Sequence, residues 1–163
     1  MKHYLYAVLA MLAILGCAIP FRTAAAQSAT HETHEFTPDT IPWGPGPPFL
    51  NPGAQLAVLE GNPAASSGDF TVRVKMPDGF RIAPHFHPNR ENVTVLQGTF
   101  KLGMGDHFDT KKMAAFTEGS FAFLDPNMHH YAMACGEVIV QVHGQSPLQF
   151  NYINPEDDPS TKK

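Results

Sequence analysis

Three side chains in the middle of the chain have the types and the spacing of metal ligands. His85 and His87 are two residues apart in a predicted strand, so both imidazoles leave the same face and can converge on one ion. Glu91 follows after the turn-forming residues 88–90, where a hairpin can fold its carboxylate back beside the two histidines. Imidazole nitrogen with carboxylate oxygen suits Mn, Fe, Ni, Cu or Zn rather than a metal that prefers thiolates. The sequence therefore predicts a site for one divalent metal ion.

The chain from residue 55 onward is predicted to be almost entirely β-strand. Residues 70–76 alternate apolar and polar side chains, which is the period of a half-buried strand. Turn-forming glycine, proline, aspartate and asparagine separate the strands, as in Pro77-Asp78-Gly79. The predicted strands cover residues 56–60, 70–76, 82–87, 91–97, 99–104, 120–124, 130–134 and 137–143, and residues 110–116 are predicted to be a loop. Many short strands with regular turn signals indicate an all-β sandwich or barrel.

The candidate ligands lie in a pattern that resembles the first motif of the cupin family. The fixed positions of that motif are occupied, at the spacing of the family, by Gly79, His85, His87, Glu91 and Gly98. The resemblance covers roughly residues 55–152 and implies a single-domain cupin, an all-β double-stranded β-helix or jelly-roll barrel. It also implies a divalent metal ion, with Mn(II) or Fe(II) first and Ni, Cu or Zn after them.

The second cupin motif is matched more loosely. The family pattern is Gly, five residues, Pro-x-Gly, two residues, His, three residues, Asn, and this chain offers Gly119, Asp125-Pro126-Asn127, His130 and Ala134. His130 thus stands where the resemblance places a fourth ligand. His129 lies beside it, but adjacent strand residues face opposite ways, and the spacing from Gly119 favours His130. The predicted metal site is then His85, His87, Glu91 and His130.

Two further sets of side chains are candidates for the surroundings of the ion. Gln141 and His143 share one face of the predicted strand 137–143, opposite a wholly aliphatic face, so this polar face looks either into the cavity or to solvent. The candidate apolar cavity wall consists of Phe86, Phe100, Leu102, Phe121, Phe123, Met128 and Met133. With enough of them pointing inward, the cavity would suit a small apolar or aromatic molecule.

The first residues have the form of an export signal. Lys2 precedes an apolar run over residues 4–19, and Ala24-Ala25-Ala26 offers a cleavage site, so we expect removal of residues 1–26 and a periplasmic or secreted protein. The run is shorter than the ~20 apolar residues that a membrane-spanning helix needs. A competing interpretation is a lipoprotein, because residues 14–17 resemble a lipoprotein box that would place a lipid on Cys17.

An irregular arm is predicted between the signal and the barrel. Residues 41–48 are rich in proline and glycine, which excludes a helix or a central strand. Trp43, Phe49 and Leu50 in this arm would be costly to leave in water. The arm therefore lies across the barrel of a partner or folds back on its own barrel, and we expect the first arrangement, in a homodimer. The predicted division of the chain is signal peptide 1–26, arm 27–54, cupin barrel 55–152 and C-terminal tail 153–163.

Charge and composition exclude some partners and leave three functions. The formal net charge of −4 becomes −6 when Lys2 and Arg22 leave with the signal peptide. A mildly acidic chain without a basic run is not expected to bind nucleic acid or an anionic membrane. The resemblance favours a metal-dependent small-molecule enzyme, with dioxygenase, decarboxylase, isomerase or lyase chemistry. The alternatives are a non-catalytic module that senses or carries a small ligand or the metal itself, and an interaction protein whose barrel supports an assembly.

Overall fold

The computed structural model describes residues 33–162. The chain divides into two compact units, Met1–His34 and Glu35–Lys163, and all the strands given below belong to the second. The predicted signal peptide, with its cleavage site and the alternative lipid site at Cys17, lies outside the described residues. Among residues 33–162, no helix has both the length and the hydropathy that crossing a membrane requires.

The second unit is built from antiparallel strands joined by turns and single-turn 3-10 helices, which confirms the predicted all-β class. The strands are β1 (Gly44–Pro45), β2 (Gln55–Gly61), β3 (Asp69–Met76), β4 (Arg81–Phe86), β5 (Glu91–Met104), β6 (Ala114–Thr117), β7 (Phe121–Leu124), β8 (His130–Gln145) and β9 (Asn151–Tyr152). The 3-10 helices are η1 (Pro38–Thr40), η2 (Thr110–Lys112), η3 (Pro155–Asp157) and η4 (Pro159–Thr161).

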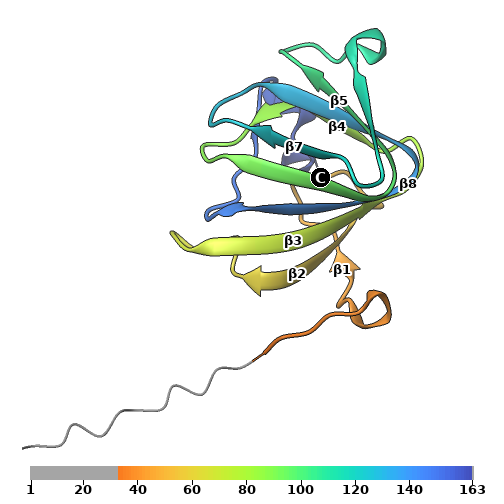
Figure 1. The fold of residues 1–163 in the computed structure, drawn as a ribbon. Helices are drawn as coiled ribbons and strands as arrows, with labels where there is room; N and C mark the ends of the chain where they lie inside the picture. Colours follow the sequence, from red (N-terminus) through yellow and green to blue (C-terminus); the bar gives the residue numbers. More distant parts are fainter. Residues whose placement is uncertain (1–32, 163) are drawn as a thin grey trace, which may run out of the picture. The chain divides into compact units, whose positions relative to one another are not determined.

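The strands form one curled sheet with β8 at its centre. One path runs β1-β2-β3-β8-β4-β9, while β5 pairs with β8 and also carries β6 and β7. Figure 1 shows β2, β3 and β8 side by side, with the sheet curling on toward β5 and β7. The β5–β8 ladder is long, from the pair Glu91↔Gly144 to the pair Met104↔His130. Its curl encloses the core and decides which side chains meet inside.

Two glycines bend this long ladder where strand ends were predicted. β5 runs through Gly98 and β8 runs through Gly136, with shifts of register around Gln97. Gly98 has a φ of +77° and Gly136 a φ of +72°, a backbone conformation that favours glycine. A Cβ on Gly98 would also lie 2.3 Å from the carbonyl oxygen of Glu137. The glycine signals were therefore read correctly as breaks in regular pairing, but the strands bend there and continue.

The predicted loop over residues 110–116 was wrong in part. It contains η2 and most of β6, which pairs with β5 from Thr99↔Thr117 to Leu102↔Ala114. β6 is bonded to β5 alone and is mostly exposed, so it lacks the alternation of apolar and polar side chains that marks a half-buried strand.

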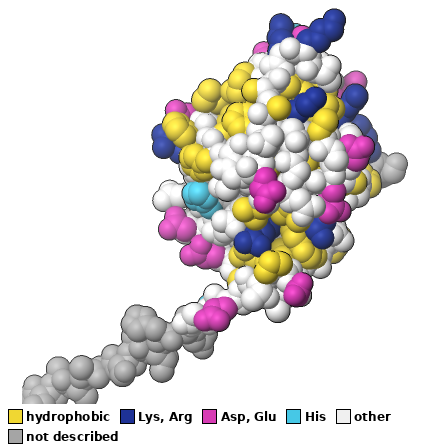
Figure 2. All heavy atoms as spheres, turned by 45° about the vertical axis from the view of Figure 1, so that its right-hand side comes forward, with side chains coloured by type: hydrophobic (Ala, Val, Ile, Leu, Met, Phe, Trp, Pro, Cys, Tyr) yellow, Lys and Arg dark blue, Asp and Glu magenta, His cyan; other side chains and the backbone are white. Residues whose placement is uncertain are grey.

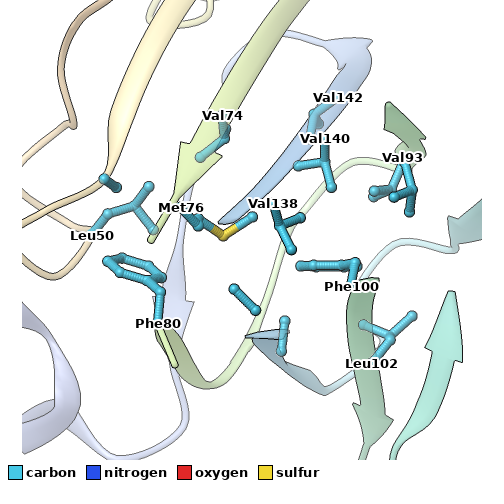
Figure 3. Close-up of a cluster of buried hydrophobic side chains, with 14 of the residues drawn as sticks. Leu50, Val74, Met76, Phe80, Val93, Phe100, Leu102, Val138, Val140 and Val142 are labelled. Carbon is cyan, nitrogen blue, oxygen red and sulfur yellow. The ribbon is translucent and has the colours of Figure 1, made fainter. Parts of the chain in front are cut away.

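The core lies on the inner face of the curled sheet. Figure 3 shows Val138 of β8 between Met76 and Phe100, with Val140 and Val142 further along the strand, and the three valines are at most 6% exposed. On the opposite face of β8, His143 is exposed and the side-chain oxygen of Gln141 accepts a hydrogen bond from Arg73 Nε at 3.1 Å. The face that carries Gln141 and His143 therefore looks outward, so these two residues do not line the cavity.

The arm packs against the barrel of its own chain. Leu50 is 6% exposed and belongs to the core, where Figure 3 shows it beside Met76 and Phe80. β1 is an edge strand that pairs Gly44 with Leu56, and Lys75 Nζ lies 4.4 Å from the ring centroid of Trp43. Leu50 is thus buried, and Trp43 and Phe49 are partly buried, against the same chain, as in the alternative in which the arm folds back on its own barrel. The homodimer stays a prediction. The need to cover the apolar side chains of the arm, which motivated it, no longer requires a partner.

The outer surface mixes charged and apolar side chains. Figure 2 shows acidic and basic groups interspersed with apolar ones on one face of the molecule. Phe121 and Phe123 of β7 are each 54% exposed because Ala122 and Leu124, which alternate with them, take the inward positions.

Candidate metal centre

Three imidazoles meet where β4 and β8 pair. His85 stands opposite His130 in the ladder, and His87 follows directly after the end of β4. All three side chains are at most 5% exposed. Their candidate ligand nitrogens lie within 4.8 Å of one another, which is close enough for all three to hold one metal ion.

Each of the three imidazoles has one nitrogen occupied by a backbone carbonyl. The Nδ1 atoms of His85, His87 and His130 lie 2.7, 2.8 and 2.9 Å from the carbonyl oxygens of Ala83, Gln149 and Met128. A carbonyl can only accept, so each Nδ1 carries the proton and each Nε2 keeps its lone pair. His87 Nε2 is buried and has no hydrogen-bond partner. A buried polar atom without a partner is costly, and a metal ion among the three Nε2 atoms would satisfy it.

Glu91 supplies the negative charge of the cluster. Its Oε2 lies 3.7 Å from His87 Nε2 and 3.4 Å from His130 Nε2, and the side chain is 12% exposed. Burial alone would raise the pKa of this carboxyl, but His87 and His130, which are positively charged when protonated, outweigh it and lower the pKa to about 2. Burial and the neighbouring imidazoles lower the pKa of His85 well below 6.5, and burial lowers that of His87. Neutral imidazoles around an ionised carboxylate form a suitable donor set for a divalent cation.

The structure thus brings the four sequence-predicted residues together, and it places His129 elsewhere. The side chain of His129 is 39% exposed, and its Nδ1 lies 2.6 Å from Asp106 Oδ1. Its ring stacks on Phe86 with the centroids 5.2 Å apart. Alternation along the chain separates the two neighbouring histidines, as predicted.

An aromatic ring that was not predicted from the sequence covers two of the imidazoles. Phe150 stacks on His85 at a centroid distance of 4.6 Å and meets His87 edge-on at 4.5 Å. Phe49 of the arm stacks on the same Phe150 at 4.7 Å. The two phenylalanines are about a hundred residues apart in the chain and outside both cupin motifs, so no local signal in the sequence places them at the site.

A small apolar cavity adjoins the cluster. Its volume is about 40 Å³, and Glu91 is its one charged lining residue. The other lining residues are Phe49, Leu50, Leu56, Val72, Val74, Met76, Ile82, Val93, Phe100, Val140, Val142, Leu148 and Phe150. The apolar lining of the cavity agrees with the prediction. Most of the residues that were predicted to form its wall, however, do not line it. Of that set only Phe100 lines this cavity, and Phe121, Phe123 and Met128 are exposed.

Comparison with known proteins places the chain in a family. None of the curated proteins compared with the chain matches it. Among solved structures, a polyketide cyclase from Streptomyces resistomycificus is 14% identical, with 79% of this chain and 91% of that one covered and a TM-score of 0.64. A candidate acetylacetone dioxygenase from Methylibium petroleiphilum is 17% identical, with coverages of 80% and 88% and a TM-score of 0.57. An RmlC-like cupin from Shewanella frigidimarina is 17% identical, with coverages of 70% and 91% and a TM-score of 0.53.

At these identities the solved structures establish the fold and nothing finer. The family itself is shown by sequence, because residues 31–148, well over half of the chain, match the family model of the ChrR cupin-like domain. The chain is therefore a cupin and belongs to the ChrR cupin-like domain family.

Proposed function

We propose that this cupin is a metal-dependent enzyme that holds one divalent ion on His85, His87, Glu91 and His130 and acts on a small molecule. The observation that carries the proposal is the convergence of three buried imidazoles, each of which has a backbone carbonyl as the partner of its Nδ1. Mn(II) or Fe(II) is proposed first, with Ni, Cu or Zn as the other ions that such donors accept. When bound, the ion would supply a Lewis-acid or redox centre.

The residues of the chain prepare this site in three ways. The carbonyls of Ala83, Met128 and Gln149 fix the tautomer and the orientation of the imidazoles. Glu91 is ionised and offsets part of the charge of a divalent ion. The apolar lining of the cavity lowers the polarity beside Glu91, which strengthens electrostatic interactions near the ligands.

The fold supports enzymatic chemistry in general terms. Two structural neighbours are named for a cyclase and a candidate dioxygenase, and both share this chain's curled β architecture. A shared fold does not transfer an activity, so the reaction and the substrate are outside the proposal.

A second candidate function is a non-catalytic module that senses or carries a small ligand or the metal. The burial of all four ligands and the cavity of about 40 Å³ favour it, since pockets that take drug-sized ligands have about 300–1,000 Å³. An ion enclosed in this way is well suited to being held.

Metal content tests both candidates. The protein is isolated from its native host, and its ions are identified and counted by elemental analysis before and after incubation with a chelator. A redox-active ion held tightly at one per chain supports the enzyme. An ion that is sub-stoichiometric and readily exchanged supports carriage or sensing. Protein that binds none of Mn, Fe, Ni, Cu and Zn after reconstitution would contradict the metal site itself.

Export is proposed as well, from the form of residues 1–26. The intact mass of protein recovered from the native host distinguishes the alternatives. A chain that begins at Gln27 supports signal cleavage and a periplasmic or secreted location. A chain that begins at an acylated Cys17 supports the lipoprotein, and an uncleaved chain contradicts both.

A further inference from the structure

Two stacked aromatic rings line the cavity inside the barrel beside the candidate metal centre. Phe49 and Phe150 both line the cavity of about 40 Å³, and Glu91 lines it as well. Phe150 also contacts the rings of His85 and His87 directly. One wall of the cavity is therefore shared with the metal ligands, and that wall is aromatic.

The segments that carry these rings are fixed to the barrel. The hydroxyl of Tyr152 donates a hydrogen bond to the carbonyl oxygen of Phe49 at 2.6 Å, which joins the C-terminal segment to the arm. β9 pairs with β4, placing Tyr152 opposite His85. Next to Phe150, the carbonyl oxygen of Gln149 accepts the hydrogen bond from His87 Nδ1. The ring of Phe150 is thus held by the segment that also orients one of the ligands.

We infer that Phe49 and Phe150 limit the ligands that reach the metal through this cavity to molecules of a few non-hydrogen atoms. The inference rests on the proposed function and narrows its substrate class. The four ligands are at most 12% exposed, and the cavity beside them has room for a few water-sized groups but not for an aromatic ring. The apolar lining selects a neutral or weakly polar molecule.

Removal of either ring should relax this limit. Phe49 and Phe150 are partly buried, and truncation of such a ring to alanine leaves a space that the surroundings fill only in part. An apolar cavity of about 150 Å³ takes benzene, so a cavity enlarged beside Glu91 should take a small ring. Phe150→Ala opens the space next to His85 and His87, and Phe49→Ala opens the space behind Phe150.

The experiment compares a diatomic and a ring-shaped ligand, both neutral, on protein loaded with Fe(II) without oxygen. Nitric oxide is the diatomic probe, and its adduct is followed by electron paramagnetic resonance. Pyridine is the ring-shaped probe, and the measurement is the pyridine concentration that halves the nitric oxide signal. We expect nitric oxide to bind the wild type with little competition from pyridine. In Phe150→Ala and Phe49→Ala the pyridine concentration should fall at least about tenfold.

Phe121→Ala and Phe123→Ala are the matched controls, because these side chains are exposed and lie outside the cavity. They should behave as the wild type. Metal content is measured first, so that a wild type that takes up neither iron nor any other of the proposed ions counts against the proposed function and not against the size limit. If Phe150→Ala loses iron, Phe49→Ala carries the test, since Phe49 lines the cavity and is not a proposed ligand. Equal competition by pyridine in the wild type and in iron-containing variants would overturn the inference, as would a wild type closed to nitric oxide.

Discussion

His129 and His130 are neighbours in the chain, and the fold gives them opposite surroundings. His130 is 3% exposed, with Nδ1 against a backbone carbonyl and Nε2 facing Glu91. His129 is 39% exposed, with Nδ1 against the carboxylate of Asp106. The same contrast continues along β8, where the valines of the inner face are buried while His143 on the outer face is exposed.

The difference shows what makes a histidine available to a metal ion. A carbonyl partner fixes the proton on Nδ1 without adding a full charge and leaves Nε2 free. His129 lies outside the group of three histidines that could hold one ion, so the face on which it lies, and not the partner of its Nδ1, separates it from the site. Burial also favours the neutral ring on the inner face.

The largest expected effect is on metal affinity, which should depend on His85 of the inner cluster and not on His129 of the outer face. His85→Ala removes one Nε2 from the inner cluster and should weaken metal binding by more than the ~10–100-fold that outer partners of a ligand contribute. His129→Ala should leave the affinity unchanged. Competition with a chelator, together with elemental analysis, measures both. Equal metal content in the wild type and His85→Ala would refute the assignment of the inner face as the site.

Acid should destabilise the metal-free protein, because it protonates the buried histidines and the glutamate of the inner face. The pKa values of His85 and His87 are lowered on folding, so stability is at its full value above the unfolded pKa of about 6.5 and is lost as the pH falls from there toward the lower folded values. The pKa of Glu91 falls from 4.5 to about 2, so its contribution is present above pH 4.5 and is lost between 4.5 and 2.

The midpoint of urea unfolding between pH 7.5 and 4 measures this loss. His85→Gln removes one of the buried titrating groups, so its midpoint should vary less with pH than that of the wild type. His129→Gln serves as the control. An identical pH dependence in His85→Gln and the wild type would show that the inner histidine does not titrate in this way.

A smaller contrast is expected in the packing of the two faces of β8. Val138 is fully buried, so Val138→Ala should lower the free energy of unfolding by about 2 kcal/mol. Gln141→Ala removes one partly buried hydrogen bond to Arg73 and should lower it by less than about 1 kcal/mol. Chemical denaturation compares them, and a larger loss for Gln141→Ala would mean that the outer face is covered in solution.

The smallest effect is expected at the pair of His129 and Asp106. Both side chains are substantially exposed, so Asp106→Asn should change the free energy of unfolding by no more than about 1 kcal/mol. Metal content should stay at the wild-type level. A marked loss of metal in Asp106→Asn would extend the site to the outer face.

Local patterns in the sequence were enough for most of the strands, though not for β6, and for the candidate ligands. Alternation predicted β3 and the facing of His85 with His87, and the cupin resemblance pointed to His130. These inferences succeed because side-chain direction in a strand repeats every two residues. The same alternation did not say which face of β8 was inside. Both possibilities had the same pattern, and only the core contacts of Val138, Val140 and Val142 decide between them.

The closure of the site was decided by the tertiary structure. Glu91 and His130 stand at opposite ends of the β5–β8 ladder, which in a flat sheet would separate them by roughly 40 Å. Bends at Gly98 and Gly136 and the curl of the sheet bring Glu91 Oε2 to 3.4 Å from His130 Nε2. Phe49 and Phe150 reach the cluster from the two ends of the described chain through packing and the hydrogen bond of Tyr152. The sequence by itself determined which donors were available, because donor chemistry and strand period are local properties. Their meeting, and the aromatic wall beside them, depended on long-range contacts that no local pattern encodes.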